Sequence, residues 1–202
     1  MTHLVDKKAF VTGGSRGIGA GIVRKLAAAG ADVAFTYRER RDAADAVARD
    51  VRDLGRAATA IKADSADPAA LVGAVEHAAK ALGRIDIFVS CAGVLLFKPI
   101  EEFSLEDFEH IVAVDLRAAF VGSKAVLSHM RSGGRIIFIS SNIADYAALP
   151  MTSLYSMVKS GLDGMMKGMA RDLGPKGITV NTVHPGPIAT DANSSEGPFS
   201  KP

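Results

Sequence analysis

Six short runs of apolar, β-branched or aromatic residues alternate along this chain with five longer stretches rich in alanine and leucine. The short runs have the length of buried strands and cover residues 9–12, 32–37, 58–61, 85–90, 135–140 and 178–183. The longer stretches have helical spacing and cover residues 18–29, 42–54, 68–82, 105–131 and 152–173. Strict alternation implies right-handed strand-helix-strand crossovers. The sequence therefore predicts an α/β fold with three layers, α/β/α, in which a doubly wound parallel sheet lies between helices.

The ends of the predicted helices carry their own signals. Asp67 followed by Pro68 has the pattern of an N-cap and a first helical residue, and Ser104 with Asp107 has the spacing of a capping box. Four glycines follow helical stretches where a left-handed backbone favours glycine: Gly30, Gly55, Gly83 and Gly174. With 202 residues, 48% of them hydrophobic, the chain is predicted to form a single domain over residues 1–202.

Composition excludes several classes of partner. The 24 basic and 22 acidic residues are scattered, so no polybasic stripe predicts binding to nucleic acid or to anionic lipid. No segment approaches the roughly 18 apolar residues of a membrane span, and the first residues lack the pattern of a signal peptide. Cys91 is the single cysteine, and no Cys/His spacing indicates a metal site. We therefore expect no metal, no membrane and a reducing, cytoplasmic location.

The segment T-G-G-S-R-G-I-G at residues 12–19 joins the first predicted strand to the first predicted helix. Gly13, Gly17 and Gly19 allow a tight turn, close approach of a phosphate and packing of the helix on the strand. The N-terminus of that helix favours negative charge, so the loop, with Ser15, Arg16 and Ile18 between the glycines, is predicted to bind a pyrophosphate. The alternative is a glycine-rich turn without a ligand.

Tyr155 and Lys159 are four residues apart on a predicted helix, so they share one face about 6 Å apart. At an effective dielectric near 20, a lysine cation at that distance stabilises a phenolate by about 3 kcal/mol. Tyr155 is therefore a candidate general acid and base for a carbonyl and its alcohol. Ser141 follows the fifth strand and is the candidate hydrogen-bond donor to the same oxygen, with Ser140 and Asn142 as neighbours that can replace it. The alternative is strand-end capping beside a surface pair of side chains.

These motifs, with the loop spacing G-x-x-x-G-x-G, resemble the short-chain dehydrogenase/reductase family over essentially all 202 residues. The resemblance implies a Rossmann fold, a small-molecule carbonyl or alcohol substrate, and a homo-oligomer, dimer or tetramer. It also implies further contacts to the cofactor. The adenine is expected near Asp64 and Ser65, the strand end at Cys91, Ala92 and Gly93 stands where the family usually has N-A-G, and the nicotinamide is expected near Pro185, Gly186, Ile188 and Thr190.

The residues after the second strand bear on the choice between NAD(H) and NADP(H). A site for NAD(H) places an acid there, whereas this chain has Tyr37 and Arg38. Arg16 lies in the glycine loop, so two guanidinium groups can converge on a 2′-phosphate. NADP(H) is therefore the predicted cofactor. Two alternatives stay open: Glu39 as a ribose ligand, or arginines that only lie on the surface.

Two features depart from the family pattern. Asp115 stands where the family usually has a fourth catalytic residue, an asparagine, and its charge is expected to cancel part of the effect of Lys159 on Tyr155. The chain also ends at Pro202, before the final helix and strand that the resemblance implies, so we expect the fold to lack them and the strand at 178–183 to form an exposed sheet edge.

The resemblance thus predicts an NADP(H)-dependent oxidoreductase that interconverts a carbonyl and an alcohol by hydride transfer, similar to the 3-oxoacyl-carrier-protein-reductase-like branch. Ser141, Tyr155, Lys159 and Asp115 are the predicted catalytic residues. Two other functions remain open. The segments 172–181 and 185–198 are similar to cyclic-di-GMP-binding regulatory members of the same fold, and Asp115 with the early end is compatible with a non-catalytic remnant.

Overall fold

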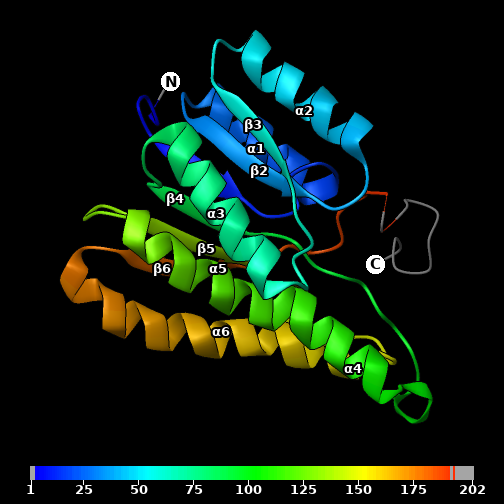
Figure 1. Ribbon diagram of the computed structural model, residues 1–202. Coiled ribbons are helices and arrows are strands. Elements are labelled where there is room, and N and C mark those ends of the chain that lie inside the picture. Colours follow the sequence, from blue (N-terminus) through cyan, green and yellow to red (C-terminus); the bar gives the residue numbers. More distant parts are fainter. Residues whose placement is uncertain (1–2, 192, 194–202) are drawn as a thin grey trace.

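The computed structural model describes residues 3–191 and residue 193, and its centre is a sheet of six parallel strands (Figure 1). The strands are β1 (Lys8–Val11), β2 (Asp32–Tyr37), β3 (Ala58–Lys62), β4 (Ile87–Ser90), β5 (Arg135–Ile139) and β6 (Thr179–Val183). Their order in the sheet is β3-β2-β1-β4-β5-β6. The order reverses between β1 and β4, which confirms the predicted doubly wound sheet and puts a ligand crevice at the ends of these two strands.

Helices cover both faces of this sheet, as predicted. One face packs against α1 (Gly17–Ala28) and α2 (Arg41–Asp53), and the other against α3 (Pro68–Leu82), α5 (Ala118–Val126) and α6 (Ser153–Leu173) (Figure 1). Val23 and Val47 lie in the first buried cluster with the sheet residue Val33. Val75 and Leu162 lie in the second with Phe88. Because helices bury both faces of the sheet, the strands are nearly continuous runs of apolar residues.

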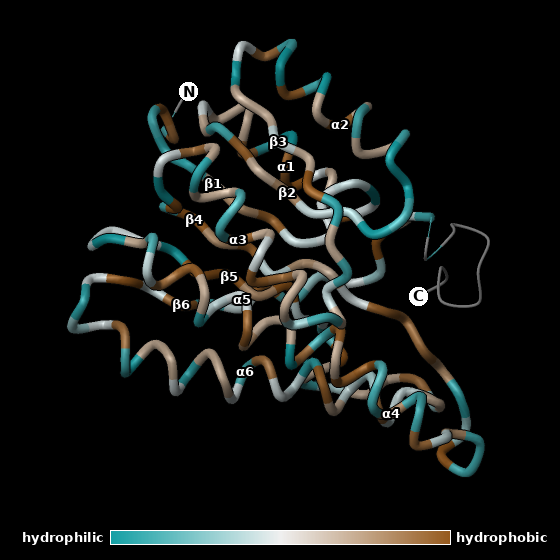
Figure 2. The backbone as a smooth tube through the Cα atoms, in the orientation of Figure 1, coloured by the Kyte–Doolittle hydropathy of each residue, from teal (hydrophilic) through white to brown (hydrophobic). Residues whose placement is uncertain are grey.

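Large side chains fill the middle of the sheet. Phe10 and Phe88 are fully buried partners on neighbouring strands, and their rings stack 5.9 Å apart. Burying one such side chain contributes roughly 1.5–3 kcal/mol. In Figure 2 the central strands are accordingly brown, whereas the outer turns of α2 are largely teal. This packing fixes the strand ends that carry the candidate site.

Most of the predicted helix ends are confirmed. Asp67 accepts hydrogen bonds from the N–H groups of Ala69 and Ala70 at the start of α3, and Ser104 and Asp107 form the capping box of α4 (Leu105–Ile111). Three glycines that follow helices have positive φ: Gly30, Gly55 and Gly83. The prediction for Gly174 is wrong, because its φ is −51° and the chain continues into a 3₁₀ turn, η5 (Gly174–Lys176). The left-handed residue is Gly177, where the chain turns toward β6.

The predicted helix at 105–131 is not one regular α-helix. The chain passes from α4 through a π-helical turn, η2 (Val112–Arg117), into α5, and ends in a 3₁₀ turn, η3 (Leu127–His129). The extra residue of a π turn changes which side chains face inward, and here it accompanies the burial of Asp115. Two further 3₁₀ turns, η1 (Ile100–Glu102) and η4 (Asn142–Ala144), lie in loops after β4 and β5.

Two further observations bear on the sequence predictions for membrane spans and for the edge of the sheet. Within residues 3–191 and 193, no helix is both long and apolar enough to cross a membrane. In the same part of the chain β6 is the outer strand beside β5, as predicted for the strand at 178–183, and its last residue, Val183, is 49% exposed.

Candidate active site

The glycine loop packs tightly against the ends of two strands. Gly13 has a φ of 69°, and a Cβ there would lie 2.9 Å from the Cα of Ala92. A Cβ on Gly19 would overlap the carbonyl oxygen of Gly13. The first and last glycines of the motif are therefore required by packing, which brings the loop close to the strand end after β4.

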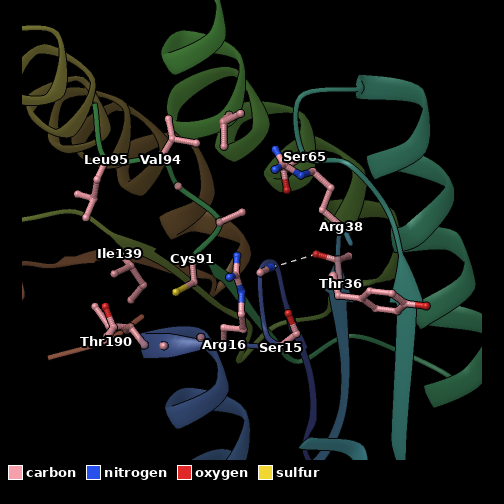
Figure 3. Close-up of a pocket in the computed structure, with 18 of the residues that line it drawn as sticks. Ser15, Arg16, Thr36, Arg38, Ser65, Cys91, Val94, Leu95, Ile139 and Thr190 are labelled. Carbon is pink, nitrogen blue, oxygen red and sulfur yellow. Dashed lines mark hydrogen bonds between the residues drawn. The ribbon is translucent and has the colours of Figure 1, made fainter. Parts of the chain in front are cut away.

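Two threonines hold this loop, and sequence reasoning missed both. Thr12 Oγ1 accepts hydrogen bonds from the N–H groups of Cys91 (3.0 Å) and Ala92 (3.1 Å). Thr36 Oγ1 accepts one from the N–H of Gly13 at 3.0 Å, the dashed line in Figure 3. A threonine near a strand end is too common to signal such a role by itself. Together the two hydroxyls join the loop to the ends of β2 and β4.

The start of α1 suits an anion. Arg16 is the N-cap residue, with an extended φ of −145°, and no side chain caps the first turn. Gly17 has a φ of 51°, and a Cβ there would lie 3.4 Å from Thr190. Backbone N–H groups at a helix start need an acceptor, and the helix dipole favours a negative one. This cradle of glycine and free helix N-terminus fits the predicted pyrophosphate.

A cleft of about 400 Å³ runs from this loop along the ends of the strands (Figure 3). It brings together most of the predicted site residues: Gly13, Ser15, Arg16, Gly17, Ile18, Gly19, Tyr37, Arg38, Asp64, Ser65, Cys91, Ala92, Gly93, Tyr155, Lys159 and Thr190. Five predicted residues are not among those that line it: Asp115, Ser141, Pro185, Gly186 and Ile188. Several lining residues were not predicted, among them Arg40, Val94, Leu95 and Ile139.

Arginines gather at the end of the cleft nearest β2. Figure 3 shows Arg16 rising from the glycine loop and Arg38 extending in the direction of Ser65. Arg38 forms an exposed ion pair with Glu39 at 2.9 Å, and Glu39, the alternative ribose ligand, also lines the cleft. Asp64 accepts a hydrogen bond from the N–H of Ala66 at 2.9 Å, which fixes its carboxylate at the rim.

Tyr155 and Lys159 lie together at the other end of the cleft. Lys159 Nζ is 5.4 Å from the centre of the Tyr155 ring, close to the separation predicted from the helix geometry. Lys159 is buried, and its ammonium also donates a hydrogen bond to the carbonyl of Ile139 at 3.3 Å. The lysine is thus held against the tyrosine by contacts from α6 and β5.

Asp115 provides the counter-ion of this lysine. Its Oδ1 lies 2.8 Å from Lys159 Nζ, and its Oδ2 accepts a hydrogen bond from the N–H of Val94 at 3.0 Å. Burial is the largest effect and acts to lower the pKa of Lys159, but Asp115, Tyr155 and Cys91 together outweigh it, so the pKa lies above its usual value. A Cβ on Gly93 would lie 2.8 Å from Asp115 Oδ1, so glycine is needed there for the ion pair to form.

The two serines after β5 have different partners. Ser140 is buried and lines the cleft, and its hydroxyl donates to the carbonyl of Lys159 at 3.0 Å. Ser141 is half-buried and is the N-cap of η4; its hydroxyl accepts a hydrogen bond from the N–H of Ile143 at 3.3 Å and donates one to Asn142 Oδ1 at 3.4 Å. The N–H of Asn142 donates to the carbonyl of Pro185 at 3.1 Å, so this loop lies beside the Pro185–Gly186 turn. Both hydroxyls therefore have acceptors within the protein, Ser140 by the shorter bond, and Ser141 as the contact to a substrate stays a prediction.

Two remaining side-chain groups bear on the sequence predictions. Burial raises the pKa of the Cys91 thiol to about 11, although Lys159 acts to lower it, so this half-buried cysteine is a thiol rather than a reactive thiolate. Asp145, Asp163 and His184 have ligand atoms within 4.8 Å of one another, a proximity of metal-ligand types that the sequence spacing did not predict. His184 Nε2 is already 2.9 Å from Asp163 Oδ1, so this nitrogen has an acidic partner.

Comparison with known proteins decides the family. The family model for short chain dehydrogenases matches residues 7–200. The chain belongs to this family. As a short-chain dehydrogenase it is 40% identical over 199 residues to the cyclic-di-GMP-binding biofilm dispersal mediator protein of Escherichia coli, an alignment that covers 98% of this chain and 80% of that protein. It is also 40% identical to versicolorin reductase 1 of Aspergillus parasiticus, over 94% of this chain and 72% of the reductase.

Solved structures of short-chain dehydrogenases superpose closely on this one. A dehydrogenase of Burkholderia cenocepacia, crystallised with NADP, is 46% identical with a TM-score of 0.96 and covers 98% of this chain and 81% of its own. BdcA, crystallised with NADPH, is 39% identical with a TM-score of 0.89, covering 98% of this chain and 78% of its own. These neighbours confirm the predicted family and fold.

Proposed function

We propose that this short-chain dehydrogenase is an NADP(H)-dependent oxidoreductase that interconverts a carbonyl and an alcohol. One observation carries the proposal: a single cleft connects the glycine loop with the Tyr155 and Lys159 pair. A dinucleotide anchored at the start of α1 can extend along this cleft toward the tyrosine. Relatives that are named as reductases support the same reaction class.

NADPH would supply a hydride when bound, and side chains of the protein would transfer the proton. In reduction, hydride addition forms a C–H bond at the carbonyl carbon while Tyr155 Oη donates its proton to the oxygen, giving the alcohol. The Lys159 cation stabilises the tyrosinate that remains, and Ser141 donates a hydrogen bond to the same substrate oxygen. Oxidation runs the same steps in reverse, with the tyrosinate as base.

The choice of NADP(H) rests on the basic end of the cleft. Arg16 and Arg38 both line it, and guanidinium groups bind phosphate through paired N–H donors. Glu39 lies against Arg38, where it offsets part of that charge without removing the donors of Arg16. The complexes of two structural neighbours with NADP and NADPH support this choice.

The test is turnover of NADPH with a panel of carbonyl compounds, comparing the unmodified chain with Tyr155→Phe. We expect the substitution to reduce the rate to a few per cent or less and to leave the Kd for NADPH nearly unchanged, because only the transferable proton is removed. Tyr146→Phe is the matched control, since Tyr146 is 75% exposed and does not line the cleft. A Tyr155→Phe protein that keeps most of its rate would assign the proton donor elsewhere.

A second candidate function is binding of cyclic di-GMP as a regulatory signal. The observation that favours it is the identity of 40% with the E. coli protein named for that ligand. The arginine end of the cleft offers cations for its phosphates. Titration of cyclic di-GMP against bound NADPH distinguishes the two, because displacement supports a shared site. If neither nucleotide binds, the third possibility remains, a protein of this fold without catalytic activity.

We also propose a cytoplasmic location and a homo-oligomeric state for this enzyme. The single cysteine, Cys91, is a free thiol, which favours a reducing cytoplasmic compartment. Phe120 on α5 is 54% exposed and Met157 on α6 is 40% exposed, and exposed apolar side chains of this size favour assembly. We therefore propose a homo-oligomer, and sedimentation at several protein concentrations tests it.

A further inference from the structure

The segment that follows β4 forms an apolar wall beside Tyr155. It reads Val94, Leu95, Leu96 and Phe97, and in Figure 2 the first part of the segment between β4 and α4 is brown. Val94 and Leu95 line the cleft, and Leu95 is 42% exposed. The Phe97 ring meets the Tyr155 ring edge to face, with centres 5.5 Å apart and planes at 66°. An aromatic side chain therefore contacts the proposed proton donor directly.

A second segment extends this wall. The N–H of Lys98 donates a hydrogen bond to the carbonyl of Met151 at 3.1 Å, so the residues before α6 lie alongside those after β4. Leu149 is 43% exposed and Met151 is 42% exposed in this neighbouring segment. Apolar side chains from two separate segments are thus presented to solvent next to the reacting end, and grouped exposure of this kind marks a binding surface.

The charges near this wall are already neutralised. Lys98 forms an ion pair with Asp107 at 2.6 Å, and Lys159 forms one with Asp115 at 2.8 Å. The other basic residues that line the cleft, within the described part of the chain, belong to the glycine loop and the residues after β2: Arg16, Arg38 and Arg40. A carboxylate or phosphate on the substrate would have to lose its hydration at an apolar wall whose cations have partners, which is costly.

We infer that the substrates are neutral carbonyl compounds with an aromatic ring attached to the carbonyl carbon, and that Phe97 selects for that ring. The inference rests on the proposed function and specifies its substrate class. With the substrate oxygen at Tyr155 Oη, the attached ring lies next to the edge-on Phe97 and the exposed leucine and methionine side chains. Aromatic pairs of this kind and burial of the ring both favour such a substrate over a charged one.

The test uses two matched pairs of substrates, measured as kcat/KM with NADPH. Acetophenone is paired with cyclohexyl methyl ketone, which has a ring of similar size without aromatic character. Methyl benzoylformate is paired with benzoylformate, which differs in carrying a free carboxylate. We expect the neutral ester to exceed the acid by tenfold or more. We expect Phe97→Leu to lower the acetophenone to cyclohexyl methyl ketone ratio by roughly two- to tenfold, as loss of one aromatic pair implies.

Controls separate selection from folding and from the proposed function. Phe97→Tyr keeps the ring and should keep the ratio, and Phe103→Leu removes the same atoms from the apolar cluster that contains Tyr155 and should also keep it. The Kd for NADPH reports whether each variant is folded. Equal turnover of acid and ester, or an unchanged ketone ratio in Phe97→Leu, overturns the substrate class while leaving the oxidoreductase intact. Bound NADPH without turnover of any of the four compounds also overturns the substrate class, whereas absence of turnover over the wider carbonyl panel overturns the proposed function itself.

Discussion

Replacing Asp115 by asparagine removes one buried charge from the reacting end of the cleft and keeps the shape of the side chain. The carboxylate is fully buried and lies 2.8 Å from Lys159 Nζ, which is itself 7% exposed. Its negative charge opposes formation of a tyrosinate at Tyr155. At any pH where Lys159 keeps its charge in the variant, we therefore expect Asp115→Asn to favour the tyrosinate, so that Tyr155 acts as a base at lower pH.

The structure bounds the size of this effect. The 2.8 Å ion pair and the 5.4 Å from Lys159 Nζ to the Tyr155 ring centre together place Asp115 Oδ1 within about 8.2 Å of that ring. At an effective dielectric near 20, two like charges at about 8 Å repel by roughly 2 kcal/mol. A free energy of that size corresponds to a shift of roughly 1.5 pH units. The buried Asp115 carboxylate is therefore expected to act on a tyrosinate at Tyr155 more strongly than a solvent-screened surface charge would.

The assay is alcohol oxidation with NADP⁺ across pH, because kcat/KM rises as the catalytic base loses its proton. We expect the midpoint of this rise to move down by one unit or more in Asp115→Asn. Asp50→Asn is the control: Asp50 pairs with Arg24 at 2.7 Å, but both side chains are 46% exposed, so solvent screens the change. A midpoint that stays in place or moves up would refute the electrostatic reasoning.

The same substitution should also cost stability. An asparagine offers one carbonyl oxygen where the carboxylate offers two, so either Lys159 or the Val94 N–H loses its acceptor. A buried donor without an acceptor costs about 1–3 kcal/mol, which lowers Tm by a few degrees in a chain of this size. Asp115 raises the pKa of Lys159, so in the unmodified chain the pair stabilises the fold below pH 10.5 and loses that contribution as the pH rises further.

Three further predictions concern the cofactor end of the cleft. The unmodified chain should bind NADPH more tightly than NADH, and alanine at both Arg16 and Arg38 should erase the difference; equal affinities before substitution would contradict the proposed role of the two arginines. Gly19→Ala should destabilise the chain by about 1–3 kcal/mol in thermal unfolding because the new methyl group meets the Gly13 carbonyl, whereas Gly21→Ala in the same helix meets nothing within 4 Å and should not. The Cys91 thiol, with a pKa of about 11, should react with iodoacetamide at pH 8 far more slowly than free cysteine, and a similar rate would show that it is not buried.

The fold could be predicted because its signals are local and repeated. Each strand pairs with neighbours that share its apolar pattern, as Phe10 does with Phe88, and several helices begin or end at a recognisable residue such as Asp67 or Gly83. The interruption of the helix at η2 could not be predicted, because the residues there have ordinary helical propensity. The π turn coincides with the contacts of Asp115 to Val94 and Lys159, which come from distant segments.

The site was predictable where a motif encodes its own geometry. Three glycines in one loop and a tyrosine four residues before a lysine specify turns and a helix face, and the structure brings both to one cleft. Thr12 and Thr36 could not be foreseen, since their role depends on which strands become neighbours. The same holds for Phe97, whose contact with Tyr155 joins segments more than fifty residues apart in sequence. The roles of the catalytic residues themselves remain predictions for the experiments above.

Gly93, Asp115 and Lys159 form one unit, and each residue type depends on the other two. Any side chain at position 93 would lie 2.8 Å from Asp115 Oδ1 and 3.3 Å from Lys159 Nζ, so the ion pair exists because the strand end after β4 carries a glycine. That same strand end is held by Thr12 and lines the cleft beside the proposed cofactor site. A displacement of the glycine loop would therefore move Gly93, change the distance between the two charges and alter the field at Tyr155. We therefore expect cofactor binding at the glycine loop to influence proton transfer at Tyr155 through this backbone contact.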